Sequence, residues 1–159
     1  MASHELLAKI ELLDKYTKMF NNQPLYFSSN FPAGIGDFNV CLQKQDQFIT
    51  IYHQIKCRQS ESAYSLEKIH NFLSKYNIEP GSDVTKKLCL DYSRLKDDKL
   101  IEFYLNLKTD QKLQKLIADN AFLIFDDSME FDKMLNLLVG FELNPNIQPL
   151  LESHLTILS

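Results

Sequence analysis

The chain has 159 residues, 45% of them hydrophobic, which is enough apolar material for a single globular domain over residues 1–159 and argues against disorder. Its 17 lysines and arginines are outnumbered by 21 aspartates and glutamates, for a formal charge of −4, so attraction of the whole surface to nucleic acid or anionic lipid is disfavoured. No apolar run reaches membrane-spanning length, which predicts a soluble protein with no membrane segment. Three widely spaced cysteines without a CxxC pair are typical of reduced thiols and predict a cytoplasmic location.

The spacing of apolar residues predicts the elements of the first half of the chain. Over residues 4–20 apolar side chains recur at helical spacing, which predicts an amphipathic helix. A short strand is expected at 25–29, before a loop rich in proline and glycine. Apolar and polar residues alternate over 38–42 and 49–55, on either side of a polar turn, which predicts a β-hairpin.

A second helix and a second hairpin are expected next. The helix spans about 62–77 and must end before Pro80 and Gly81, because proline cannot continue the hydrogen-bond ladder. Residues 87–92 and 100–105 flank a polar stretch and suit a hairpin, although the later segment also fits a helix.

The last third is predicted to be mainly helical. Asp110 lies in the first turn of one helix, and Asp127 or Ser128 caps another. Residues 121–125 between them fit either a strand or a helix end, and the tail from Pro149 resembles a short docked helix. The order of elements predicts an α+β fold, in which a small antiparallel sheet of two hairpins carries helices on one face.

Two segments of the first hairpin suggest an enzyme. Gly36–Val40 reads GDFNV and Tyr52–Lys56 reads YHQIK, and together they resemble the core of the PD-(D/E)XK nucleases. In that family an acid at the start of one strand, and an acid or glutamine two residues before a lysine on the next strand, hold a divalent metal. The resemblance implies that Asp37 and Gln54 share a Mg²⁺, while Lys56 stabilises the attacking hydroxide or the phosphate charge.

The same residues have a plainer interpretation as an amphipathic hairpin with a solvated polar face. An acid or glutamine two residues before lysine also occurs at Asp97-x-Lys99 and Asp110-x-Lys112, as chance predicts for this composition. Gln54 moreover stands where most members of the family have Glu, which leaves one fewer negative ligand. In the nuclease interpretation Glu11 supplies the upstream acid that some members carry, and nucleic acid is the partner.

The predicted order of elements resembles a different family, the class I chaperones of bacterial type III secretion, which dimerise and hold an effector segment in extended form. This resemblance spans residues 4 to about 120 and implies a homodimer that binds another protein. The loop at 32–36 and the helical tail after 126 depart from the chaperone pattern. Acidic immunity proteins, which block a toxin by charge and shape, fit the size and charge equally well.

Aromatic residues gather near the glycine-containing loop: Tyr26, Phe27, Phe31 and Tyr52. Aromatic side chains supply contact area at low entropic cost, so this set is the predicted binding surface unless its members belong to the core. His53 falls on the apolar face of its strand, which favours a core histidine satisfied by a backbone carbonyl over a metal-binding or catalytic role.

From the sequence we therefore predict a protein-binding module without catalysis or cofactor, such as an effector chaperone, an immunity protein or a similar inhibitor. A Mg²⁺-dependent nuclease that uses Asp37, Gln54 and Lys56 is the alternative. The charge distribution keeps that alternative open, because residues 38–60 contain a single acid, Asp46, and three basic residues.

Overall fold

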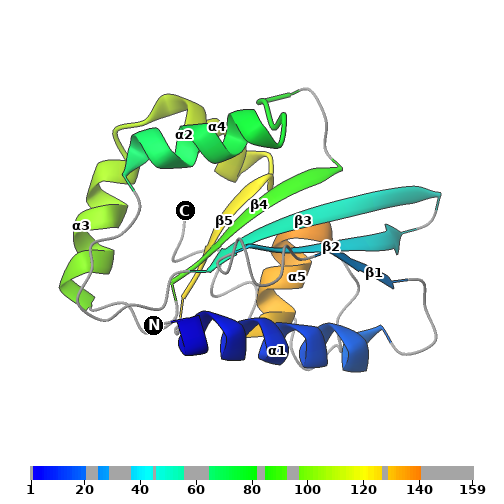
Figure 1. Ribbon diagram of the computed structural model, residues 1–159. Helices are drawn as coiled ribbons and strands as arrows, with labels where there is room; N and C mark the ends of the chain where they lie inside the picture. Colours follow the sequence, from blue (N-terminus) through cyan, green and yellow to red (C-terminus); the bar gives the residue numbers. More distant parts are fainter. Residues whose placement is uncertain are drawn as a thin grey trace.

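The computed structural model describes residues 2–20, 25–28, 37–44, 46–55, 65–81, 85–92, 97–126 and 129–140. The elements in chain order are α1 (Ala2–Met19), β1 (Leu25–Ser28), β2 (Asp37–Lys44), β3 (Gln47–Ile55), α2 (Leu66–Lys75), β4 (Lys86–Asp91), α3 (Asp97–Leu107), α4 (Gln111–Ala118), β5 (Phe122–Phe125) and α5 (Phe131–Val139) (Figure 1). The helix predicted from Pro149 lies outside the described residues. No helix within the described ranges is long and apolar enough to cross a membrane.

The five strands within the described ranges form one sheet, in the order β1-β2-β3-β4-β5. β1, β2 and β3 pair antiparallel, whereas β3, β4 and β5 pair parallel. Parallel neighbours need a crossover connection, which α2 supplies between β3 and β4, and α3 with α4 between β4 and β5. The α+β class is confirmed, but the expectation of a purely antiparallel sheet is wrong, because the sheet is mixed.

The first predicted hairpin is confirmed. β2 and β3 pair from Lys44 opposite Gln47, beside the turn, to Asp37 opposite Gln54 at the open end. One face of this hairpin is apolar and buried against the rest of the protein: Phe38, Val40, Leu42, Ile49 and Ile51. Because alternate residues of a strand point to the same face, slipping the register by one residue would expose this whole set.

The second predicted hairpin is wrong in its later strand. The earlier strand is β4, but residues 100–105 lie in α3. Phe103 and Leu107, which are four residues apart, are buried, while Ile101 and Leu105 are 61% and 59% exposed. This helical spacing emerges only when the pattern is followed as far as Leu107.

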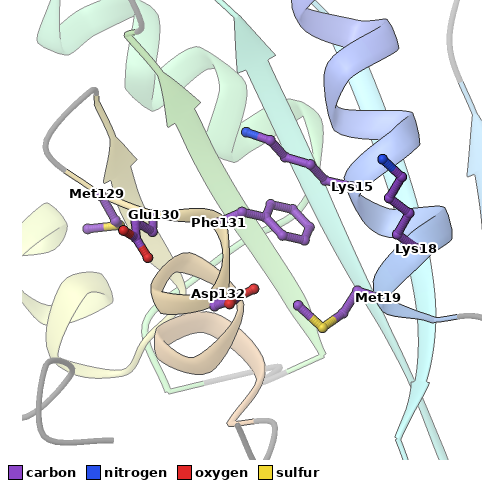
Figure 2. A pocket seen from close by; sticks show the side chains of 7 residues that line it. All are labelled: Lys15, Lys18, Met19, Met129, Glu130, Phe131 and Asp132. Atoms are coloured by element: carbon purple, nitrogen blue, oxygen red, sulfur yellow. The ribbon is translucent and has the colours of Figure 1, made fainter. Parts of the chain in front are cut away.

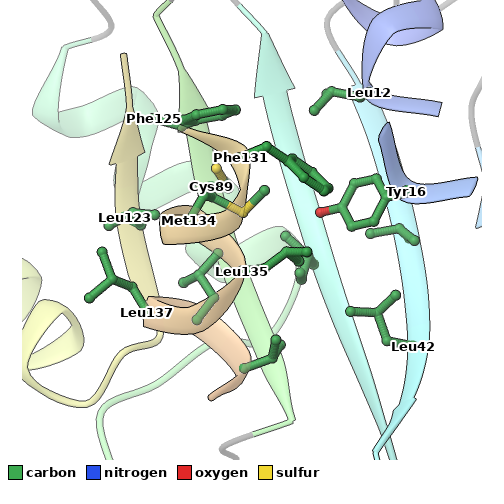
Figure 3. Packing of buried hydrophobic residues seen from close by; sticks show 14 of the residues in the cluster. Leu12, Tyr16, Leu42, Cys89, Leu123, Phe125, Phe131, Met134, Leu135 and Leu137 are labelled. Carbon is green, nitrogen blue, oxygen red and sulfur yellow. The ribbon is translucent and has the colours of Figure 1, made fainter. Parts of the chain in front are cut away.

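Helices cover both faces of the sheet, which corrects the expectation that they pack on one face (Figure 1). α1 and α5 pack on one face around Tyr16, Met134 and Leu135 (Figure 3). α2, α3 and α4 supply the core on the other face. The reason lies in β4 and β5: all four residues of β5 are buried, so apolar side chains on both sides of the sheet need a covering layer.

The start of α5 differs from the predicted one. The residue that precedes the helix is Glu130, not Asp127 or Ser128, and its side chain makes no capping hydrogen bond. The helix ends at Gly140, whose φ of 64° is in the left-handed region that glycine adopts without steric cost.

Asp110 joins two helices on the second face. It precedes α4, where its Oδ1 accepts a hydrogen bond from the backbone N–H of Leu113 at 3.0 Å. Its Oδ2 lies 2.6 Å from Nε2 of His70 on α2. Partial burial acts to raise the pKa of Asp110, but the hydrogen bonds from Leu113 and His70 outweigh it, so the pKa lies below its usual value.

Asp110→Ala is expected to destabilise the protein by about 1–2 kcal/mol, because the first turn of α4 loses its cap. Asp110→Asn is the matched control, since asparagine caps a helix about as well as aspartate. Urea unfolding at neutral pH measures both. If the two variants lose the same stability, the charge facing His70 matters and the cap does not.

Candidate functional site

The residues of the nuclease motif lie at the open end of the hairpin. Asp37 is the first residue of β2, and its Cα partner across the strand pair is Gln54 on β3. For Asp37 the structure describes the backbone position, and Lys56 lies just beyond β3, outside the described residues. Residues directly opposite in an antiparallel pair share a face of the sheet. The register therefore places Asp37 beside Gln54, the glutamine that lies two residues before Lys56. We call these two residues the Asp37–Gln54 pair.

The other two triplets of the same kind have no such setting. Asp97 is the first residue of α3, and Asp110 is the residue before α4. Neither lies on a strand. Of the three triplets in the chain, the one at Gln54 alone stands on a strand opposite an acid.

The side chain of Gln54 is buried and fixed by a hydrogen bond. It is 2% exposed, and its Nε2 donates to the hydroxyl of Tyr76 at 2.7 Å. Tyr76 follows the last residue of α2, so this bond ties the hairpin to the crossover helix. The ring of Tyr76 stacks on Tyr52, with ring centroids 4.0 Å apart and planes inclined by 14°.

Asn39 adds a second amide beside the pair. It lies two residues after Asp37 on β2, and its Cα partner on β3 is Tyr52. Its Oδ1 is buried and accepts no hydrogen bond from the described residues. A buried acceptor without a donor costs about 1–3 kcal/mol. A carbonyl oxygen in this position is the kind of ligand that Mg²⁺ prefers.

The residue types at this end of the hairpin are aspartate, glutamine and asparagine, all of which carry oxygen donors. Oxygen donors suit Mg²⁺ or Mn²⁺ better than soft metals. Within the described ranges no three His, Cys, Asp or Glu side chains gather as a metal cluster. Glu11, the expected upstream acid, is exposed on α1, the helix that covers the other face of the sheet.

His53 lies in the core beneath α1. It is fully buried, and its Nε2 is 2.7 Å from the hydroxyl of Tyr16. Its Nδ1 has no partner among the described residues. Burial lowers the pKa of His53 from 6.5 to about 3, so the ring is neutral. The prediction of a core histidine is confirmed, but a tyrosine hydroxyl, not a backbone carbonyl, is its partner.

The predicted aromatic binding surface falls only partly within the described residues. Tyr26 and Phe27 lie on β1, for which the backbone is described, and Phe31 lies outside the described ranges. Tyr52 is half-buried and its ring faces Tyr76. Among the described residues Cys41 and Cys89 are free thiols, and Cys57, the third cysteine of that prediction, lies outside them.

A groove lies between α1 and the start of α5. The groove could not be predicted from the sequence, because its existence depends on how these two helices pack. Its volume is about 640 Å³. Figure 2 shows its lining: Lys15, Lys18, Met19, Met129, Glu130, Phe131 and Asp132. The two lysines face two acids across an apolar floor, so the groove carries no net charge that would select an ionic ligand.

The comparisons with known proteins identify no relative. No family model matches the chain, and no curated protein or solved structure matches it.

Proposed function

We propose that the chain is a metal-dependent nuclease that uses Asp37, Gln54 and Lys56. The single observation that carries the proposal is the strand register, which makes Asp37 the direct partner of Gln54. Composition alone predicts the Gln-x-Lys triplet by chance, but it does not predict that an acid lies opposite that triplet at the start of the adjacent strand. The register supports the nuclease proposal over the protein-binding module that the sequence favours.

Each residue has one role in the proposal. The carboxylate of Asp37 and the amide oxygen of Gln54 hold the cation, and the ammonium of Lys56 stabilises negative charge on the nucleophile or on the phosphate. A Mg²⁺ held there supplies Lewis-acid polarisation of a phosphate oxygen and lowers the pKa of water. The proposal is supported by the backbone positions of Asp37 and Gln54, which lie on strands rather than on a loop.

The proposal predicts metal-dependent cleavage of nucleic acid. The purified chain is incubated with duplex DNA, single-stranded DNA or RNA, in Mg²⁺, Mn²⁺ or EDTA, and products are resolved by electrophoresis. Cleavage is expected with metal and not with EDTA, and Lys56→Ala should lose it while the circular dichroism spectrum stays unchanged. Failure of the unaltered chain to cut any of these substrates with either metal would contradict the proposal.

The protein-binding function is the second candidate. It is favoured by the exposed apolar positions Ile101 and Leu105, one helical turn apart on α3. The chaperone resemblance loses support, since a helix follows β4 where that element order has a strand. A homodimer rests on the same resemblance and stays a prediction. Purification from native lysate at gentle salt, with no stoichiometric partner recovered, would count against this function.

A further inference from the structure

We infer that the groove between α1 and the start of α5 binds a short apolar peptide with free termini. The two walls of the groove carry opposite charges: Lys15 and Lys18 on α1, and Glu130 and Asp132 at the start of α5 (Figure 2). The carboxylate of the peptide contacts the lysines, its ammonium contacts the acids, and its side chains lie on the apolar floor. This site is separate from the proposed metal site, and the inference goes beyond the proposed nuclease function.

The charges on the two walls are available to a ligand. In the part of the chain that the structure describes, no ammonium of the α1 wall lies within ion-pair distance of a carboxylate of the α5 wall. Lys18 pairs with Asp14 at 2.9 Å, but both side chains are largely exposed, so this pair contributes little. Lys15, Glu130 and Asp132 have no ion-pair partner among the described residues. Because the walls do not neutralise each other, each attracts the opposite group of a ligand.

The floor between the walls is apolar and suits side chains of varied shape. Phe131 and Met129 are each 8% exposed, and Met19 is 40% exposed. The ring of Phe131 is held edge-to-face against Tyr16, with centroids 4.7 Å apart. Methionine side chains are flexible and adapt to irregular apolar partners. The groove volume of about 640 Å³ is in the range of small-ligand pockets.

The apolar floor that divides the two charged walls selects the class of ligand. A free amino acid and a zwitterionic lipid headgroup each carry their two charges close together, which suits a site whose charges are adjacent. A dipeptide or tripeptide carries its charges at opposite ends, about 7–11 Å apart when extended, with side chains between them. The direction of the peptide follows from the charges. Its ammonium is drawn to Glu130 and Asp132, because their two negative charges outweigh the partial positive charge at the start of α5.

The dipeptide phenylalanyl-leucine tests the inference, with binding followed by NMR chemical shifts of the ¹⁵N-labelled full chain. We expect saturable binding with a dissociation constant of about 0.1–1 mM, which is ordinary for a ligand of this size. The N-acetylated and the C-amidated dipeptides each lack one charge. Each is expected to bind about 2- to 5-fold more weakly than the free dipeptide, the usual effect of one exposed ion pair.

Combined changes in the protein and the ligand separate these contacts from a general effect on the groove. The double variant Lys15→Met, Lys18→Met should weaken binding of the free and the N-acetylated dipeptide but not of the C-amidated one. The double variant Glu130→Gln, Asp132→Asn should weaken binding of the free and the C-amidated dipeptide but not of the N-acetylated one. Lys115→Met on α4 is the matched control and should change none of these affinities.

Three results overturn the inference. The first is no saturable binding by the unaltered protein. The second is equal binding of the free and the blocked dipeptides, which indicates an apolar surface for the interior of a protein segment. The third is an equal loss for all three dipeptides in either double variant. Metal-dependent cleavage should be unchanged in both double variants, so a failure of the peptide site and a failure of the proposed nuclease function are observed separately.

Discussion

Asp37→Asn is expected to abolish metal binding and cleavage together, whereas Lys56→Met should retain metal binding and lower the cleavage rate by about 10²–10³-fold, the usual cost of removing one charge-stabilising group. The difference follows from the roles proposed for the two residues. Asp37 is the one carboxylate of the proposed ligand set, so without it only neutral amide oxygens face the cation. Lys56 carries charge to the reacting phosphate but does not hold the metal.

Two measurements separate the loss of metal binding from the loss of cleavage. One is the single-turnover cleavage rate at saturating Mg²⁺, and the other is direct Mn²⁺ binding. Lys99→Met is a matched control, because Lys99 belongs to a triplet of the same spacing on α3 and not on a strand. Its rate should equal that of the unaltered protein. Should Lys56→Met lose the metal as completely as Asp37→Asn does, the assignment of separate roles is wrong. Wild-type rates in both variants would place the cleavage elsewhere in the chain.

The protein is expected to lose stability as the pH falls from about 6.5 to about 3, because His53 is buried in its neutral form. Burial lowers the pKa of His53 in the folded state to about 3 from its ordinary value of 6.5. The unfolded chain therefore binds one more proton than the folded chain within this window. The free energy of unfolding falls by up to about 1.4 kcal/mol per pH unit as the medium is acidified, and this contribution is fully present above pH 6.5.

Urea unfolding at a series of pH values measures this slope. His53→Gln removes the titrating ring and keeps a group that can bond to Tyr16, so its stability should depend less steeply on pH in this window. An unchanged slope in His53→Gln would show that other groups cause the acid sensitivity.

The hairpin and the Asp37–Gln54 pair could be predicted from the sequence, because they depend on local features. Alternation of period two defines the buried face of β2 and β3, and a short turn between Lys44 and Gln47 leaves little freedom in the register. The helix at α3 could not be predicted in the same way. Apolar residues stand next to one another in the middle of this segment, so their spacing fits a helix or a strand. Only the burial of Phe103 and Leu107 in the structure shows that the spacing is helical.

The hydrogen-bond partner of Gln54 could not be predicted from local features, for a different reason. Tyr76 is 22 residues away along the chain, and the crossover of α2 from β3 to β4 brings it back over the hairpin. In the sequence it is one apolar position of a helix end. Likewise, the parallel pairing of β4 with β3 depends on where α2 packs, which the strand pattern of β4 does not specify.

The consecutive strand order has a consequence for how the protein is made. Because β1 to β5 pair in the order in which they are synthesised, each strand can join the sheet as it emerges, without waiting for a distant segment or threading past one. β2 and β3, which carry the Asp37–Gln54 pair, precede in the chain the helices α2, α3 and α4 that cover the face of Gln54. A two-stranded hairpin is marginally stable by itself, so the pair is held in place only once these later elements pack on it.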